Sequence, residues 1–115
     1  MCGIIGYQGY FNFDLLKQGV NLIAHRGPDF QNYYKNNDAR IALGHARLSI
    51  QDLSSNGNQP MSSSDNKYYI IFNGEIYDFI HHREELVKDG IKFQSKTDTE
   101  VLLQLYIKYG VHFVK

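Results

Sequence analysis

Five stretches of the chain have the apolar pattern of β-strands. They are short, rich in β-branched and aromatic residues, and bounded by turn-forming residues. In chain order they are GIIGYQGYF (3–11), FQNYYK (30–35), ARIALGHARLSI (39–50), KYYIIFNG (67–74) and IKFQS (91–95). The second and third flank the polar sequence NND, which predicts a β-hairpin that turns at residues 36–38.

Three other stretches space their apolar residues as an amphipathic helix does. DLLKQGVNLIAHRG (14–27) ends before a proline, which stops a helix. DFIHHREELVKDG (78–90) closes with a glycine. TDTEVLLQLYIKYG (97–110) begins with Thr97 and Glu100 at the spacing of a capping box. The sequence therefore predicts three helices in addition to the strands.

A polar stretch with Gly and Pro, LSSNGNQPMSSSDN (53–66), predicts a long loop between the two halves of the chain. Strands and helices are mixed, and at least one pair of strands is joined by a hairpin. This favours an α+β fold with a largely antiparallel sheet over a strict parallel βαβ repeat. A length of 115 residues is typical of a single domain.

Composition narrows the class of protein. An apolar fraction of 43% supports a packed core, and the formal net charge of zero argues against bulk nucleic-acid binding. No segment approaches the ~20 apolar residues of a membrane helix. The single cysteine cannot form an internal disulfide, which favours a reducing compartment. We expect a cytoplasmic protein with no membrane and no nucleic-acid partner.

The only cysteine, Cys2, directly follows the initiator methionine. A lone cysteine is most often a small, inert core residue. The alternative is chemical, because removal of Met1 would leave the thiol and a free α-amino group on one residue. Their reference pKa values of ~8.5 and ~8 lie near physiological pH, so the amine can act as the base that activates the thiol.

Two further sequence motifs each allow a structural and a chemical interpretation. Asn73-Gly74 is a hairpin signal, but a helical pattern follows it, so the Asn amide and the Gly N–H can instead form an oxyanion hole. Arg47 ends an apolar strand, where it is either a solvated charge or a fork for a substrate carboxylate.

Asp98 lies at a helix start, where a carboxylate either complements the helix dipole or accepts a substrate ammonium group. His25, Arg26 and Asp29 cluster at a Gly-Pro turn, which is either a plain turn or a loop that closes over a ligand. The remaining histidines have no zinc-ligand spacing, so we expect no metal, and there is no Gly-rich phosphate loop.

Taken together and in order, these motifs resemble one family. CGIIG, HRGPD, HARLSI, NQPM, NGEIYD and TDTE are similar to the glutamine amidotransferase domain of class II amidotransferases, and RLSIQD resembles the asparagine-synthetase type. The resemblance spans the whole chain. It implies the N-terminal-nucleophile hydrolase fold, an αββα sandwich of two antiparallel sheets between helix layers. It also implies hydrolysis of L-glutamine to glutamate and ammonia through a cysteine thioester.

The resemblance also implies a role for each matching residue. Cys2 would be the nucleophile, with its own α-amine as base, and Asn73 and Gly74 would form the oxyanion hole. Arg47 would hold the α-carboxylate of the substrate. Asp98 and Glu75 would hold its α-amino group, and Leu48 and Ile50 would line the pocket.

Glutaminase domains of this family continue past the sequence YGVHFVK, so we expect residues 1–115 to be an incomplete domain, truncated on the C-terminal side. ATP and magnesium would belong only to a synthetase domain, which is absent here and would pass the ammonia to an activated carboxylate, with aspartate expected. The missing half of the sandwich and the synthetase domain would be partners, in cis or as a second chain. The alternative is an inactive fragment that acts as a glutamine-binding or partner-docking module.

Overall fold

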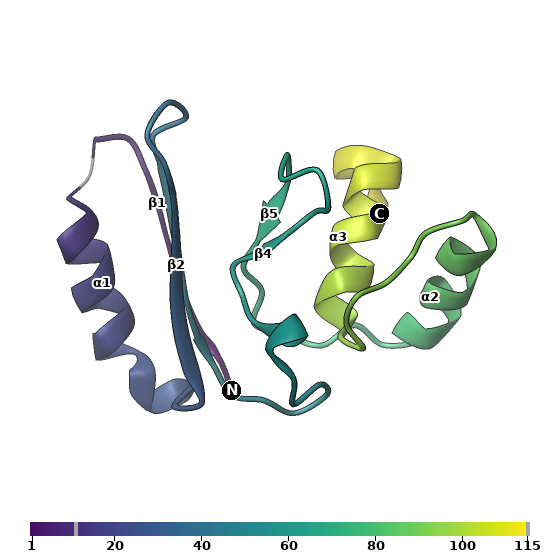
Figure 1. Ribbon diagram of the computed structural model, residues 1–115, viewed down its shortest axis with the longest axis horizontal. Coiled ribbons are helices and arrows are strands. Elements are labelled where there is room, and N and C mark those ends of the chain that lie inside the picture. Colours follow the sequence, from purple (N-terminus) through teal and green to yellow (C-terminus); the bar gives the residue numbers. More distant parts are fainter. Residues whose placement is uncertain (11, 115) are drawn as a thin grey trace.

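The computed structural model describes residues 1–10 and 12–114, and these form a mixed helix and antiparallel-sheet structure of the α+β class, as predicted (Figure 1). The helices, strands and 3-10 turns (η) are β1 (Gly3–Gln8), α1 (Phe13–Leu22), η1 (Ala24–Arg26), β2 (Phe30–Asn36), β3 (Ile41–Arg47), η2 (Ser55–Gly57), β4 (Met61–Ser62), β5 (Tyr69–Ile70), α2 (Phe79–Lys88), α3 (Asp98–Tyr109) and η3 (Gly110–Val114).

The first sheet has the strand order β1-β3-β2, and both pairs are antiparallel. The predicted hairpin is confirmed, with β2 and β3 joined by a turn over residues 37–40. In the β1–β3 pair Gly3 lies opposite Ala46. The start of β1 is therefore beside the end of β3, which brings Cys2 close to the HARLSI segment.

One face of β3 consists of small residues and is covered by α1. Ala42 and Ala46 are fully buried, and a Cβ on Gly44 would lie only 2.3 Å from Cγ2 of Val20 on α1. Leu16 and Val20, one helical turn apart, are the buried residues of α1. Small side chains on the strand thus let the helix lie close to the sheet.

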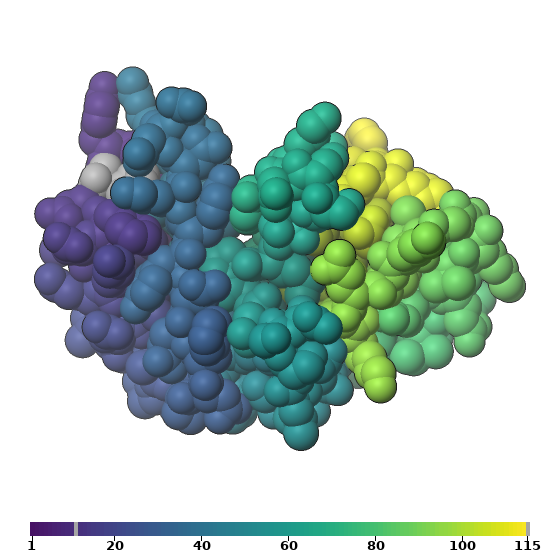
Figure 2. Space-filling model, in the orientation of Figure 1, coloured from purple at the N-terminus to yellow at the C-terminus, as the bar shows by residue number. Residues whose placement is uncertain are grey.

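The opposite face of β3 carries Leu43, His45 and Arg47, because side chains alternate along a strand. This face is turned toward the second, two-stranded sheet, β4–β5. The rings of Tyr34 on β2 and Tyr69 on β5 stack at a centroid distance of 3.6 Å. Figure 1 shows the resulting succession of α1, the first sheet, β4–β5, α3 and α2. Figure 2 shows the notch between the halves.

The second half of the chain has its own small apolar core. Leu86 of α2 packs with the α3 region, where Val101 and Leu103 are also buried. The predicted helices 78–90 and 97–110 are confirmed as α2 and α3 within two residues at each end. The expected loop 53–66 is interrupted by η2 and by the two residues of β4.

The strand predicted over residues 67–74 is too long. Only Tyr69–Ile70 pair as a strand, with Met61–Ser62. Beyond them the N–H of Phe72 donates to Oε1 of Gln59 at 2.6 Å instead of to a neighbouring strand. The Gln59 side chain therefore takes the place of the neighbouring strand that would pair with Phe72 in a longer β-strand.

The short strand predicted over residues 91–95 is wrong. The N–H groups of Gln94 and Ser95 donate to the two carboxylate oxygens of Glu100, at 2.9 and 2.6 Å. This also changes the predicted capping box. Thr97 caps α3 by accepting from the N–H of Glu100, but the Glu100 side chain turns to the preceding segment rather than back to Thr97.

At the N-terminus, the predicted strand 3–11 is observed as β1 up to Gln8, and Phe11 lies outside the described residues. The predicted helix 14–27 is divided into α1 and η1, separated at Ile23. Within residues 1–10 and 12–114, no helix is both long and apolar enough to cross a membrane.

Candidate active site

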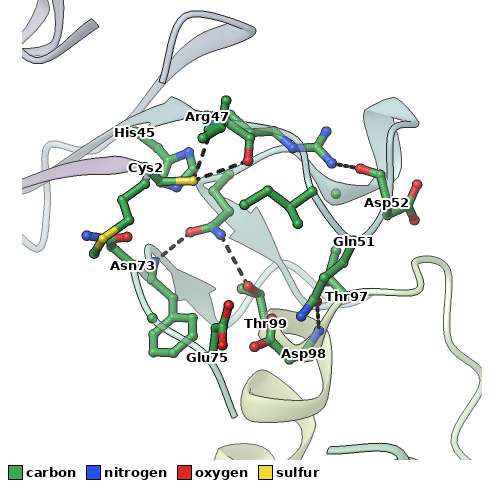
Figure 3. Close-up of a pocket in the computed structure, with 17 residues that line it drawn as sticks. Cys2, His45, Arg47, Gln51, Asp52, Asn73, Glu75, Thr97, Asp98 and Thr99 are labelled. Carbon is green, nitrogen blue, oxygen red and sulfur yellow. Dashed lines mark hydrogen bonds between the residues drawn. The ribbon is translucent and has the colours of Figure 1, made fainter. Parts of the chain in front are cut away.

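All eight predicted site residues line one cavity of about 310 Å³ (Figure 3). The cavity lies where the end of the first sheet meets the loops that precede α2 and α3. The sequence places these residues far apart, so their convergence is a product of the fold. The predicted residues in the lining are Cys2, Arg47, Leu48, Ile50, Asn73, Gly74, Glu75 and Asp98.

The thiol of Cys2 is half-buried and held by the backbone of Leu48. The Leu48 N–H donates to Sγ at 3.3 Å, and the Leu48 carbonyl lies 3.6 Å from Sγ, where it can accept from the thiol. Nε of Arg26 donates to the Cys2 carbonyl at 3.4 Å. The sulfur therefore has a fixed position at the cavity wall, and an N–H donor of this kind stabilises a thiolate.

Arg47 is a buried cation, with 5% of its surface exposed. Its Nη1 donates to the Ser54 carbonyl at 2.6 Å and to Oδ1 of Asn58 at 2.7 Å, and its Nη2 donates to the Asp52 carbonyl. Every one of these acceptors is uncharged. Among the described residues Arg47 makes no ion pair with a carboxylate.

A guanidinium has five N–H donors, and the loop of residues 52–58 occupies three of them. Within the described chain, Nε–H and one Nη2–H of Arg47 remain without a partner. These two donors form the fork that binds a carboxylate in two parallel hydrogen bonds. Gly57 allows this packing, because a Cβ there would lie 2.3 Å from Nη2 of Arg47.

Asp98 provides a buried negative charge in the same cavity. Oδ2 accepts from the N–H of Ile76 at 2.9 Å, and the Asp98 N–H donates to Oε1 of Gln51 at 2.9 Å. The other oxygen, Oδ1, has no hydrogen bond within the described residues. Asp98 is the first residue of α3, so its charge also complements the helix dipole. Both interpretations made from the sequence are therefore compatible with its position.

Asn73, Gly74 and Glu75 follow β5 and form another wall of the cavity. Asn73 is half-buried, whereas Gly74 and Glu75 are exposed. A Cβ on Gly74 would lie 2.8 Å from the Phe72 ring, so glycine permits this close turn. The predicted hairpin alternative for Asn73-Gly74 is not observed, because the chain continues into α2.

Leu48 and Ile50 line the same cavity as Cys2, Arg47 and Gln51. Leu48 contributes its backbone to the Cys2 sulfur, as described above. Ile50 is 69% exposed and offers an apolar surface at the cavity mouth.

The cluster at the Gly-Pro turn fixes the surroundings of the cavity rather than lining it. Arg26 reaches the Cys2 carbonyl, and Oδ2 of Asp29 accepts from the Ser49 N–H at 2.7 Å. His25 is exposed and its Nδ1 lies 3.1 Å from the Leu22 carbonyl. Between residues 1 and 114, Phe11 excepted, no three His, Cys, Asp or Glu side chains are arranged to hold a metal ion.

Sequence reasoning missed three polar residues that support the cavity. Gln51 fixes the start of α3 through Asp98, and Gln59 joins Thr99 to the Phe72 backbone. The carboxylate of Asp52 accepts from Ser54 and from the Lys96 N–H, and these hydrogen bonds lower its pKa to about 2. Such contacts between side chain and distant backbone leave no periodic signal in a sequence.

His45 was also missed, although it lies two residues before Arg47 and so on the same face of β3. It lines the cavity and is 1% exposed. Burial is the main cause that lowers its pKa from 6.5 to about 4; the Phe72 backbone opposes the shift and the charge of Arg47 adds to it. His45 is therefore a neutral imidazole at physiological pH.

The cavity thus combines a thiol, a buried cation that makes no ion pair and a carboxylate, which are the groups needed to hold an amino acid and attack its side chain. Residues 1–115 match the family model described as "Glutamine amidotransferase domain". The chain belongs to this family.

Similarity to curated proteins covers almost the whole chain. It is 45% identical over 116 aligned positions to asparagine synthetase [glutamine-hydrolyzing] 1 of Bacillus subtilis, covering 95% of this chain and 18% of that protein. It is 38% identical to putative asparagine synthetase [glutamine-hydrolyzing] 2 of Methanocaldococcus jannaschii, covering 100% and 25%. The amidase chyE of Penicillium rubens is 40% identical, covering 88% and 15%. The chain corresponds to a quarter or less of the length of these relatives, at their N-terminal portion.

Proposed function

We propose that this chain forms a site that hydrolyses L-glutamine to glutamate and ammonia through a thioester on Cys2. The observation that carries the proposal is the pairing of a fixed thiol with Arg47, a buried cation whose neighbours among the described residues are uncharged oxygens. The nearby Asp52 carboxylate accepts from Ser54 and Lys96 and makes no direct ion pair with Arg47. A buried cation without an ion-pair partner is costly, and the α-carboxylate of an amino acid would pair with it. The words "glutamine-hydrolyzing" in the names of the relatives support glutamine as that amino acid.

In the proposed mechanism Met1 is removed first, which frees the α-amine of Cys2. That amine takes the thiol proton, and the thiolate attacks the side-chain amide carbon of glutamine. Asn73 and Gly74 donate hydrogen bonds to the oxygen that becomes negative. The C–N bond breaks, ammonia leaves with the proton, and water then resolves the thioester.

The remaining residues orient the substrate. The free fork of Arg47 holds the α-carboxylate, and Asp98 with Glu75 holds the α-ammonium group. Leu48 and Ile50 line the side-chain path between them. This arrangement would select a substrate with one negative group, one positive group and a neutral amide.

The wider architecture is part of the same proposal. The succession of helix, sheet, sheet and helices in Figure 1 supports the αββα sandwich of N-terminal-nucleophile hydrolases. The length of the relatives supports a synthetase domain, in cis or as a second chain, in which ATP and magnesium activate the carboxylate that receives the ammonia. Aspartate is the acceptor expected from the relatives named asparagine synthetases.

A cycle of residue and substrate changes tests the assignment. In the full gene product, Arg47→Gln should raise KM for glutamine about 30-fold or more, the loss expected for a charge-assisted hydrogen-bond pair. For γ-aminobutyramide, which lacks the α-carboxylate, the same substitution should change KM little. Arg40→Gln, at the exposed hairpin turn, is the matched control and should behave as the wild type with both compounds.

The same preparations establish whether Cys2 is the nucleophile. Intact mass should show loss of Met1 and one equivalent of label from a chloroketone analogue of glutamine, blocked by glutamine and absent in Cys2→Ala. Glutaminase activity that survives in Cys2→Ala would eliminate the mechanism. An equal loss for both compounds in Arg47→Gln would mean that Arg47 only supports the loop of residues 52–58.

A further inference from the structure

His45 is the one buried side chain, among those the structure describes, whose polar atoms make no hydrogen bond of normal geometry. Both Nδ1 and Nε2 are shielded from solvent; the Phe72 backbone lies near enough to the ring to raise its pKa but does not complete a well-formed hydrogen bond. An unsatisfied buried polar group costs about 1–3 kcal/mol, so such groups in folded proteins call for an explanation. An apolar residue of similar size would avoid this cost on a sheet face.

The location of His45 ties it to the chemistry. Ile4 lies opposite His45 in the β1–β3 ladder, and Cys2 is two residues before Ile4, so His45 and Cys2 are diagonal neighbours on one sheet face. Both line the cavity, and Figure 3 shows the imidazole at the same end of it as the Cys2 sulfur. Met1 also lines this cavity and is removed in the proposed mechanism, so a partner for the shielded imidazole can enter at this end once Met1 is gone.

The proposed reaction leaves one reactant without a protein group that orients it. The α-carboxylate of glutamine is assigned to Arg47, the α-ammonium to Asp98 and Glu75, and the amide oxygen to Asn73 and Gly74. The water that resolves the thioester has only the α-amine of Cys2, which takes its proton, and no group that orients it. Water must approach the acylated sulfur, which is the end of the cavity where His45 lies.

We infer that His45 positions the water that attacks the Cys2 thioester. This inference rests on the proposed function and adds a residue to it. A neutral imidazole accepts a hydrogen bond from the water at one ring nitrogen. The water oxygen attacks the thioester carbon, its proton passes to the α-amine of Cys2, the C–S bond breaks, and glutamate leaves as the thiol re-forms.

The proposed role of His45 can be measured because it belongs to one half of the reaction. Formation of the thioester should not need His45, whereas its hydrolysis should. We would compare His45→Met and His45→Gln in the full gene product, two side chains of equal length of which only glutamine forms hydrogen bonds. His45→Asn places the amide at the Nδ1 position and His45→Gln at the Nε2 position. Turnover of glutamine, the rate of labelling by the chloroketone analogue, and the mass of acid-quenched protein are measured for each.

For His45→Met we expect turnover to fall about tenfold or more, the size expected when a reactant loses its orientation. Labelling should stay within about twofold of wild type, and the glutamyl thioester should accumulate in quenched samples. His45→Gln or His45→Asn should restore turnover. His81→Leu, an exposed histidine on α2, is the matched control and should change nothing.

Labelling also reports whether the cavity is assembled, so a variant that does not fold is recognised, and His45→Leu then replaces His45→Met. Wild-type turnover in a labelled apolar variant overturns the inference. So does an equal loss of labelling and turnover, which would place His45 in acylation or in the architecture. Failure of the proposed function is distinct, because the wild type itself would then neither label at Cys2 nor release ammonia from glutamine.

Discussion

The two halves of this molecule are held together by different means. In residues 3–47 a continuous antiparallel ladder and the face of α1 supply the order, with small residues of β3 packed under Val20. In residues 48–109 the only ladder among the described residues is the short β4–β5 pair. There, side chains hold loop backbone: Glu100 holds residues 94–95, and Gln59 holds Phe72.

The first half is therefore a rigid support for the cavity. The second half supplies polar groups that individual hydrogen bonds hold in place. The ladder fixes Cys2 and Arg47 by register alone, because β1 begins where β3 ends. The second half must instead bring Asn73 and Asp98 to the same cavity without regular structure, and it does so with hydrogen bonds between side chain and backbone. The cavity lies where the two halves meet, so it depends on both kinds of order.

The largest predicted effect tests the ladder half. A Cβ on Gly27 would lie 2.0 Å from the carbonyl oxygen of Ala46, a backbone atom of β3 that cannot rotate away. We therefore expect Gly27→Ala to lower the free energy of unfolding by about 3–4 kcal/mol. Urea denaturation measures it.

Gly6→Ala is the control for that substitution. A Cβ on Gly6 would meet Leu43 and Ile71 at ordinary contact distances of 3.7 and 3.9 Å. Gly6→Ala should therefore be neutral or stabilise by about 0.5 kcal/mol, since glycine is unfavourable within a strand. Equal effects of the two substitutions would contradict the close approach of η1 to β3.

The ladder half was also the half that the sequence predicted well. Apolar runs, helical spacing and turn chemistry predicted β1, the β2–β3 hairpin and α1, because these elements depend on local patterns; β1 is more exposed than its apolar sequence suggested. In the other half, the strands expected at 67–74 and 91–95 were shortened or absent. Their backbone donors bind the side chains of Gln59 and Glu100, and hydrogen bonds from side chain to backbone leave no periodic pattern in the sequence.

The site shows the same division. Motif order predicted eight residues that line one cavity, but the contacts that position them were not predicted. Arg47 was expected to be either a solvated charge or a fork for a substrate carboxylate, whereas it is buried and three of its donors hold the loop of residues 52–58. Gln51 and His45 carried no local signal beyond the position of His45 on the same face as Arg47. The roles of the eight residues remain predictions.

A pH experiment tests the place where the halves meet. Burial lowers the pKa of His45 from 6.5 to about 4, so between these values the unfolded chain binds a proton that the folded chain does not. Stability is therefore fully present above about pH 6.5 and lost as the pH falls toward about pH 4. We expect His45 to account for about 2–3 kcal/mol of the difference in unfolding free energy between about pH 7 and about pH 4.5.

The measurement compares urea denaturation of the wild type with that of His45→Gln, which has no titrating ring. The variant should lose less stability over this interval. Asp52 does not interfere, because its pKa is lowered to about 2 and its contribution is lost below the interval, as the pH falls from 3.8. Identical pH dependence in both proteins would mean that His45 is not held neutral by burial.

The smallest predicted effect tests the polar order of the second half. The Glu100 carboxylate is buried and accepts from the N–H groups of Gln94 and Ser95 and from the Ser95 hydroxyl. In Glu100→Gln an amide NH₂ replaces one of the two accepting oxygens. One N–H donor of the preceding segment then loses its acceptor, so we expect a loss of about 2 kcal/mol in the free energy of unfolding. Glu84→Gln, exposed on α2, should change it by less than about 0.5 kcal/mol. If both substitutions cost equally little, the segment before α3 would be held by packing rather than by Glu100, and the contrast between the two halves would disappear.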